Sequence, residues 1–127
     1  MRKKLLIDTC VIIDYLRNDK SAVDYFEKLT SSLFISVITV AEIHAGIRNE
    51  KEQKLVSHFL NAFEIIPADN TIAVTSGEFC KKYRNSHGTG LADAIIAATA
   101  FHHEANLVTL NIRHFPMLKA IKPYEKK

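Results

Sequence analysis

Short apolar runs alternate with longer amphipathic stretches along the chain. The short runs are rich in Leu, Ile and Val and predict strands at residues 3–8, 33–38, 64–68 and 106–110, with a further short one at 120–123. In the longer stretches apolar residues recur every three or four positions, which predicts helices at residues 10–16, 21–29, 39–48, 52–63, 69–84 and 91–105. Because strands and helices alternate, the sequence predicts an α/β fold in which helices cover both faces of a parallel sheet.

Few residues interrupt these elements. The chain contains only 4 glycines and 3 prolines, and no repeat or linker divides it, so we expect one domain over residues 1–127. The clearest break is His87–Gly90, which precedes the stretch 91–105. That stretch is apolar nearly all round and is expected to be a buried helix. Ser21 is the expected N-cap of the second helix.

Composition and charge narrow the class of protein. Hydrophobic residues make up 47% of the chain and charged residues 24%, which is the balance of a globular domain and not of a disordered chain. The net charge of +3 permits attraction to polyanions such as nucleic acids. Asp8 and Asp14 interrupt the first apolar run, which argues against a signal peptide, and no apolar stretch is long enough to cross a membrane. We therefore expect a cytoplasmic protein without a membrane partner.

Three acidic side chains are expected at the same edge of the sheet. Asp8 comes directly after the first strand, Glu42 follows the second strand in the first turn of its helix, and Asp93 lies in the first turn of the buried helix. In open parallel sheets the loops at the carboxyl ends of the strands meet at one edge, where sites collect. The sequence therefore predicts that these carboxylates converge.

A converged cluster of carboxylates cannot stay ionised unaided. Two carboxylates about 5 Å apart repel by roughly 3 kcal/mol at an effective dielectric constant near 20, so three pairs approach about 10 kcal/mol. That is comparable to the roughly 5–15 kcal/mol that stabilises a whole domain. Either the pKa values rise or a cation lies among the acids, and oxygen ligands suit Mg²⁺ or Mn²⁺. Helix N-termini would contribute only about 1 kcal/mol each, which favours the metal.

Each acid also has a structural explanation. Thr39 and Glu42 fit a capping box, with Thr39 as the N-cap and Glu42 bonding back to the backbone. Asp8 can cap the helix that follows it, and Asp93 can stabilise the N-terminus of its own helix. Cys10 has no partner histidine of the kind that a nucleophilic site needs, so we expect a half-buried structural thiol.

Four segments of the chain resemble the motifs of PIN-domain proteins, and in particular the VapC-type toxins of prokaryotic toxin–antitoxin pairs. The segments are LLIDTCVIIDYL, FISVITVAEIHAGI, LADAIIAATAF and LVTLNIRHF, which occur in the same order and spacing between Leu5 and Phe115. The resemblance implies a three-layer α/β/α sandwich with a short parallel sheet. It also implies an endoribonuclease that depends on Mg²⁺ or Mn²⁺, acts on RNA, forms a homodimer and is inhibited by a cognate VapB-like antitoxin.

The same resemblance assigns roles to individual residues. By motif, Asp8, Glu42 and Asp93 match the catalytic, metal-binding acids of the family, and Thr9 and Thr109 match the small polar residues beside them. Many members carry a fourth acid shortly after the last strand, and this chain offers Asn111 there instead. A neutral amide at that place implies a weakly held second ion, so one and two ions both remain open.

Basic residues are the candidate contacts for RNA phosphates. Arg113 and His114 follow the strand that bears Thr109, and Arg113 is the preferred contact. A wider basic rim would consist of Arg48, Lys81, Lys82 and Arg84. The alternative for all of these residues is simple solubility.

Two other functions compete with the nuclease. A PIN-like RNA-binding module without catalysis would be signalled by the loss of a core acid, and none of the three is missing. A receiver-like phosphoacceptor domain also has this size and acids at strand ends. It would need paired early acids, a phosphoacceptor Asp after a central strand and a late Lys, which the sequence does not convincingly supply.

Overall fold

A computed structural model describes residues 3–126, and its four strands form one sheet in the order β3-β2-β1-β4. The strands are β1 (Lys4–Ile7), β2 (Ser32–Ser36), β3 (Glu64–Ile66) and β4 (Asn106–Val108). Every strand pair is parallel, as predicted. Central β1 pairs with β2 on one side and β4 on the other, so both of its edges are hydrogen-bonded.

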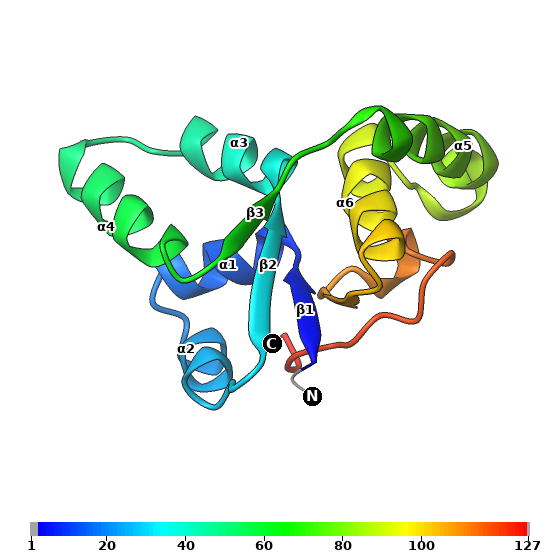
Figure 1. The fold of residues 1–127 in the computed structure, drawn as a ribbon. Coiled ribbons are helices and arrows are strands. Elements are labelled where there is room, and N and C mark those ends of the chain that lie inside the picture. The colour runs from blue at the N-terminus through cyan, green and yellow to red at the C-terminus, as the bar shows by residue number, and fades with distance from the viewer. Residues whose placement is uncertain (1–2, 127) are drawn as a thin grey trace.

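Helices pack on both faces of this sheet, which gives the expected three-layer sandwich (Figure 1). The helices are α1 (Thr9–Leu16), α2 (Lys20–Glu27), α3 (Val37–Ala45), α4 (Glu50–Leu60), α5 (Asn70–His87) and α6 (Leu91–His102), followed by the short 3₁₀ helix η1 (Ile112–His114). Helices α1 to α4 lie on one side of the sheet, and α5 and α6 lie on the other. Among the described residues no helix has the length and apolar character needed to cross a bilayer.

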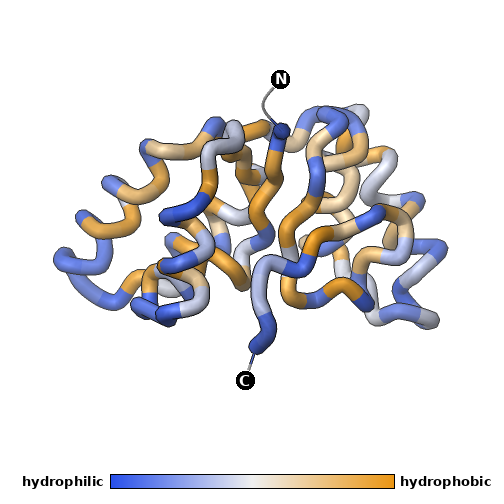
Figure 2. The backbone as a smooth tube through the Cα atoms, turned by 90° about the horizontal axis from the view of Figure 1, so that it is seen from below, coloured by the Kyte–Doolittle hydropathy of each residue, from blue (hydrophilic) through white to orange (hydrophobic). Residues whose placement is uncertain are grey.

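The alternation of side chains along β1 divides the core into two parts. Leu5 and Ile7 pack into the cluster under α1 and α4, whereas Leu6 points to the cluster under α5 and α6. Helix α6, which was expected to be buried, contributes Ile96 and Ala97 to the second cluster. In Figure 2 hydrophobic segments occur in both halves of the molecule, and many of the outlying turns are hydrophilic.

The helix starts predicted at residues 10, 21, 39 and 52 are each one or two residues late, because a polar residue earlier in the chain caps the helix. The starts of α3 and α2 illustrate this. Ser36 ends β2 and its hydroxyl accepts a hydrogen bond from the Ile38 amide over 3.1 Å, so α3 begins at Val37 and not at residue 39. In α2 the cap is Asp19, whose carboxylate accepts from the Ala22 amide over 3.2 Å, in place of Ser21.

The C-terminal segment returns across the molecule and fastens to α1. The strand predicted at 120–123 is reduced to a single parallel bridge between Ile121 and Val108. Beyond it the Tyr124 hydroxyl donates to Asp14 over 2.8 Å, and the Lys126 ammonium lies 2.6 Å from the same carboxylate. Burial raises the pKa of the Tyr124 phenol and the Asp14 charge raises it further, so the hydroxyl keeps its proton.

We expect Tyr124→Phe to lower the free energy of unfolding by about 1–2 kcal/mol, because a hydrogen bond to a buried carboxylate is worth more than a neutral one. Urea unfolding followed by circular dichroism measures this. Lys122→Met is the matched control in the same segment. It removes an exposed pair with Glu125 and should cost less than about 0.5 kcal/mol. Equal effects of the two substitutions would contradict a fastening role for Tyr124.

Candidate active site

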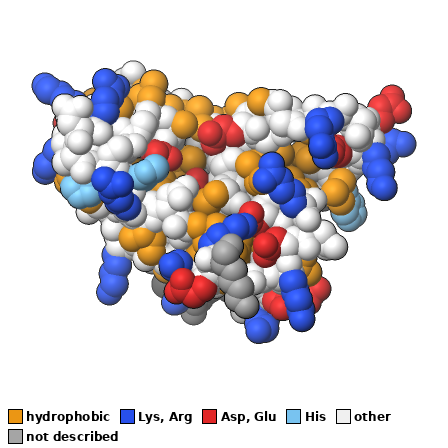
Figure 3. All heavy atoms as spheres, turned by 180° about the vertical axis from the view of Figure 1, so that it is seen from behind, with side chains coloured by type: hydrophobic (Ala, Val, Ile, Leu, Met, Phe, Trp, Pro, Cys, Tyr) orange, Lys and Arg blue, Asp and Glu red, His pale blue; other side chains and the backbone are white. Residues whose placement is uncertain are grey.

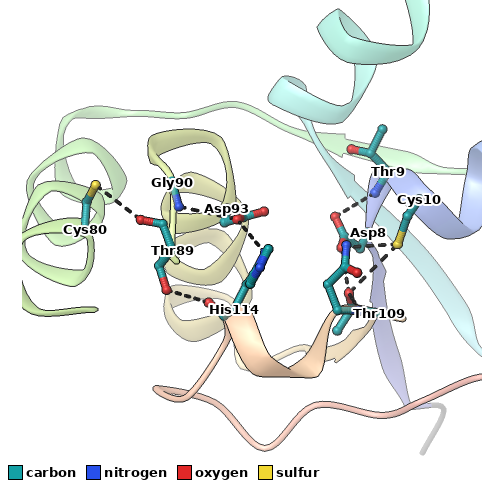
Figure 4. Close-up of polar contacts among 10 residues, drawn as sticks. Asp8, Thr9, Cys10, Cys80, Thr89, Gly90, Asp93, Thr109 and His114 are labelled. Atoms are coloured by element: carbon teal, nitrogen blue, oxygen red, sulfur yellow. Dashed lines mark hydrogen bonds and ion pairs between the residues drawn. The ribbon is translucent and has the colours of Figure 1, made fainter. Parts of the chain in front are cut away.

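Asp8 is buried at the carboxyl end of the central strand, with a relative exposure of 4%. Its Oδ1 accepts a hydrogen bond from the Thr9 amide over 2.8 Å, so Asp8 caps α1. Its Oδ2 accepts from the Thr109 hydroxyl over 2.6 Å and from the Cys10 thiol over 3.5 Å (Figure 4). Asp8 thus caps α1, and its carboxylate also accepts a hydrogen bond from Thr109, which follows the neighbouring strand. The capping role and the site role expected from sequence are therefore compatible.

The register of the sheet explains why Thr109 reaches Asp8. In the pairing of β1 with β4, Ile7 lies opposite Val108, so the next residues along, Asp8 and Thr109, leave the sheet side by side. The Thr109 hydroxyl is in turn oriented because it accepts from the Asn111 amide over 3.0 Å. Its proton is therefore directed at the carboxylate of Asp8.

Asp93 approaches the same place from the other layer. It lies in the first turn of α6, and its Oδ2 accepts from the Gly90 amide over 3.4 Å. The ring nitrogen Nδ1 of His114 lies 3.2 Å from the same oxygen. In Figure 4 the carboxylate of Asp93 points across toward Asp8. As with Asp8, a local capping role and a place in the site coexist in one side chain.

Burial and charge together disfavour ionisation of Asp8. Desolvation by burial raises the pKa of its carboxyl above the ordinary value of 3.8, the hydrogen bond from Thr109 opposes this, and the negative charge of Asp93 raises the pKa further. The charge of Asp93 is the smallest of these influences, so the two carboxylates are coupled only in the sense that the charge of one raises the pKa of the other.

Glu42 joins the pair indirectly. It lies in the second turn of α3, because the helix begins at Val37, and its side chain is exposed. The Thr9 hydroxyl donates to its Oε1 over 2.6 Å, so one residue, Thr9, contacts Asp8 through its amide and Glu42 through its hydroxyl. The capping box predicted for Thr39 and Glu42 is wrong, since Thr39 is buried inside the helix and bonded to the Thr9 hydroxyl at 3.0 Å.

Within residues 3–126, no three side chains of the His, Cys, Asp and Glu types stand close enough to enclose a metal by themselves. The expected compact cluster of three acids is therefore replaced by the pair Asp8 and Asp93, with Glu42 one residue removed through Thr9. This donor set still fits Mg²⁺, which prefers oxygen ligands and is commonly held by one or two carboxylates plus water and substrate phosphate oxygens. The coupled carboxylates Asp8 and Asp93 are the residues able to hold such an ion.

Cys10 lies beside this pair but is not a nucleophile. Burial raises the pKa of its thiol to about 12, with a further contribution from the charge of Asp8. The protonated thiol donates to Asp8 and lies 4.0 Å from the Thr109 hydroxyl. This agrees with the structural thiol expected from sequence.

The other predicted site residues lie around the segment after β4. Asn111 is exposed, and its backbone amide, not its side chain, makes the contact with Thr109. Arg113 is exposed on η1. His114 lies 3.2 Å from Asp93, a contact that differs from the RNA contact expected for it from sequence. Reasoning from the sequence missed this contact and missed Thr89, a fully buried residue whose hydroxyl donates to the His114 carbonyl over 2.7 Å.

Three residues of the expected basic rim lie on α5, and the fourth lies between α3 and α4. Lys81, Lys82 and Arg84 are exposed on α5, and Arg48 is paired with Glu52 at 2.7 Å. Seen from behind, acidic side chains lie near the middle of the upper part of the molecule, with Lys and Arg side chains to either side (Figure 3). Such an arrangement attracts a polyanion to the rim and leaves its approach to the acids dependent on a cation.

We expect Asp8→Asn to stabilise the protein in EDTA at pH 7. A raised carboxyl pKa means that the folded state binds more protons than the unfolded chain above pH 3.8, so ionised Asp8 costs stability at neutral pH and the cost disappears as the pH falls to 3.8. The gain should be within the range of an ordinary single substitution, about 0.5–3 kcal/mol, and should shrink as the pH falls through the raised pKa of Asp8 toward 3.8. Thermal denaturation between pH 4 and pH 7 measures it.

The control for this experiment is Glu78→Gln, an exposed carboxylate on α5, which should leave Tm almost unchanged at every pH. A loss of stability in Asp8→Asn that does not vary with pH would show that losing the acceptor for the Thr109 hydroxyl outweighs the desolvation of the carboxylate.

The sequence and the fold both match known proteins. The family model of the PIN domain matches residues 5–119. The chain is 38% identical to ribonuclease VapC10 of Mycobacterium tuberculosis over 122 residues, which covers 94% of this chain and 91% of the relative. Among solved structures, a toxin–antitoxin complex from Klebsiella pneumoniae contains a chain that superposes with a TM-score of 0.82 at 30% identity, covering 96% of this chain and 99% of that one.

A second solved structure, VapBC2 from Rickettsia felis bound to a DNA fragment from their promoter, has a TM-score of 0.76 at 25% identity and covers 94% of this chain and 97% of that one. The matched segment includes β1, α3, α6 and the segment after β4, which carry Asp8, Glu42, Asp93 and Thr109. The chain belongs to the PIN-domain family and, within it, to the VapC type.

Proposed function

We propose that this chain is a metal-dependent endoribonuclease that acts as the VapC-like toxin of a toxin–antitoxin pair, as a single cytoplasmic domain over residues 1–127. The observation that carries the proposal is the coupled pair of Asp8 and Asp93 at the carboxyl edge of the sheet. Relatives named as ribonucleases support the choice of reaction.

The acids of this site divide the work of phosphodiester hydrolysis. Asp8 and Asp93 would hold a Mg²⁺ or Mn²⁺ ion, and the exposed Glu42 would ligate a second ion or orient the attacking water. When bound, such an ion supplies neutralisation of the phosphate charge and activation of water. Side chains of the protein hold the acids themselves in position. Thr9 and Thr109 hold the carboxylates in place by the bonds described above.

Substrate binding falls to the exposed groups around the acids. Arg113 on η1 would bind an RNA phosphate next to the scissile one, and the rim residues on α5 would attract the strand electrostatically. The exposed side chain of Asn111 would be a neutral ligand for a second ion, which would accordingly be weakly held. The Cys10 thiol beside the pair stays protonated and therefore does not serve as a general base.

The proposed partners are a VapB-like antitoxin, which inhibits the enzyme, and a second copy of the chain in a homodimer. Solved relatives described as toxin–antitoxin complexes support the antitoxin. The family assignment replaces the receiver-like alternative. A catalytically weak RNA-binding PIN module remains the second candidate, favoured by the lack of a three-ligand cluster among the described residues.

A cleavage assay separates the two candidates. Purified protein should cut RNA with Mg²⁺ or Mn²⁺ and stop in EDTA, and Asp93→Asn should reduce the rate more than about 100-fold, beyond the 10–100-fold typical of residues that only support a metal ligand. Glu78→Gln is the control and should retain full activity. RNA that binds to folded, metal-supplemented protein but remains intact would favour the RNA-binding module.

A growth assay tests the toxin role. Expression of the chain in a bacterial host should arrest growth, because an unrestrained ribonuclease depletes RNA, while Asp8→Asn should not. Coexpression of a small DNA-binding protein from the adjacent reading frame should restore growth and copurify with the chain. Arrest that persists with Asp8→Asn would separate toxicity from the proposed chemistry.

A further inference from the structure

The oxygens of the two coupled acids are held differently. Asp8 accepts hydrogen bonds at both oxygens, with the Thr9 amide bonded to Oδ1. On Asp93 both polar neighbours lie at Oδ2: the Gly90 amide donates over 3.4 Å, and His114 Nδ1 lies 3.2 Å away. On Asp8, the donors at Oδ2 are Thr109 and Cys10. The backbone bond to Asp93 is long, so the orientation of its carboxylate depends on His114.

His114 is itself fixed by its surroundings. Its carbonyl accepts the hydroxyl proton of the fully buried Thr89, and its amide donates to the Asn111 carbonyl over 2.9 Å. The next residue, Phe115, is 1% exposed and anchors the segment in the core. The ring, 37% exposed, borders Gly88, whose φ of +70° makes the turn before α6. These bonds fix the backbone of His114 and therefore the region that its ring can reach.

The chemistry of the contact sets its direction. A carboxylate only accepts hydrogen bonds, so a favourable contact between Nδ1 and Asp93 requires that Nδ1 carry a proton. Donation to Oδ2 leaves Oδ1 without a donor from this pair of groups. In Figure 4 the Asp93 carboxylate extends from the His114 contact toward Asp8.

We propose that His114 is a positioning residue for Asp93, and that its Nδ1–H fixes the carboxylate so that Oδ1 is presented to a divalent cation shared with Asp8. This inference rests on the proposed function, because it supplies a role at the same metal site. It assigns to His114 a task different from phosphate binding. Groups that orient metal ligands in this way typically contribute 10–100-fold to metal affinity.

The test is Mn²⁺ binding to the RNA-free protein, measured by isothermal titration calorimetry. His114→Leu should weaken binding about 10- to 100-fold. His114→Asn places an amide donor near the position of Nδ1 and should restore most of the affinity. His114→Gln places its amide nearer the position of Nε2 and should not. His58→Leu, on the exposed face of α4, is the matched control and should bind as the parent protein does.

Steady-state cleavage on the same variants gives a second readout. At saturating Mn²⁺ the KM for RNA should stay within about twofold of the parent in all of them, because His114 is not assigned to the substrate. A raised KM with unchanged Mn²⁺ affinity would overturn the inference in favour of an RNA contact. Restoration by Gln and not by Asn would overturn it in favour of direct ligation through Nε2.

The outcomes also separate this inference from the proposed function. If the parent protein binds Mn²⁺ and all His114 variants bind it equally well, the positioning role is wrong and the nuclease stands. If the parent protein neither binds Mn²⁺ nor cleaves RNA, the proposed function fails and the inference fails with it. Should His114→Leu not fold, the comparison of Asn with Gln still decides.

Discussion

A carboxylate buried at the end of the central strand is the constraint on which the rest of this site depends. Removing a charged group from water costs several kcal/mol unless hydrogen bonds or a counter-charge compensate. Asp8 is 4% exposed and receives donors from Thr9, Cys10 and Thr109, which come from the helix after its own strand and from the end of the neighbouring one. Placing those donors requires β1 and β4 to be adjacent, parallel and in register.

Sheet topology supplies one half of the site, and helix packing supplies the other. Because the strands run parallel, the loops after β1, β2 and β4 leave the same edge, and they bring Thr9, Glu42 and Thr109 together. Asp93 follows no strand. It is placed by the turn at Gly88 and by the anchoring of Thr89 to the His114 carbonyl, which tie α5 and α6 to the segment after β4.

The sequence predicted the order of the elements and the acids because both follow from local patterns. Periodicity of apolar residues identified each helix and strand, and Asp8 could be placed at a strand end without any knowledge of its partners. The start of α3 was mispredicted because Val37 and Ile38 are β-branched and continue a strand pattern, while the decisive group is the hydroxyl of Ser36. The contacts of Thr109, Thr89 and His114 join residues far apart in the chain, and no local signal encodes them.

The sequence predicted three equivalent acids, whereas the structure has the pair Asp8 and Asp93 with Glu42 linked through Thr9. Electrostatic repulsion explains this difference. Three carboxylates about 5 Å apart would repel by roughly 10 kcal/mol. The charge of Glu42 is not among the causes that raise the pKa of Asp8, and the charge of Asp93 is the smallest of them, so the acids avoid most of this repulsion. The remaining cost is that of ionising Asp8, because burial and, to a smaller extent, the charge of Asp93 raise its pKa. Protons and a divalent cation therefore compete for the same oxygens. Burial makes an ionised carboxylate costly when no counter-charge is present, and it also strengthens the attraction between that carboxylate and a cation. The same burial therefore lowers the stability of the protein without a cation and raises its affinity for one.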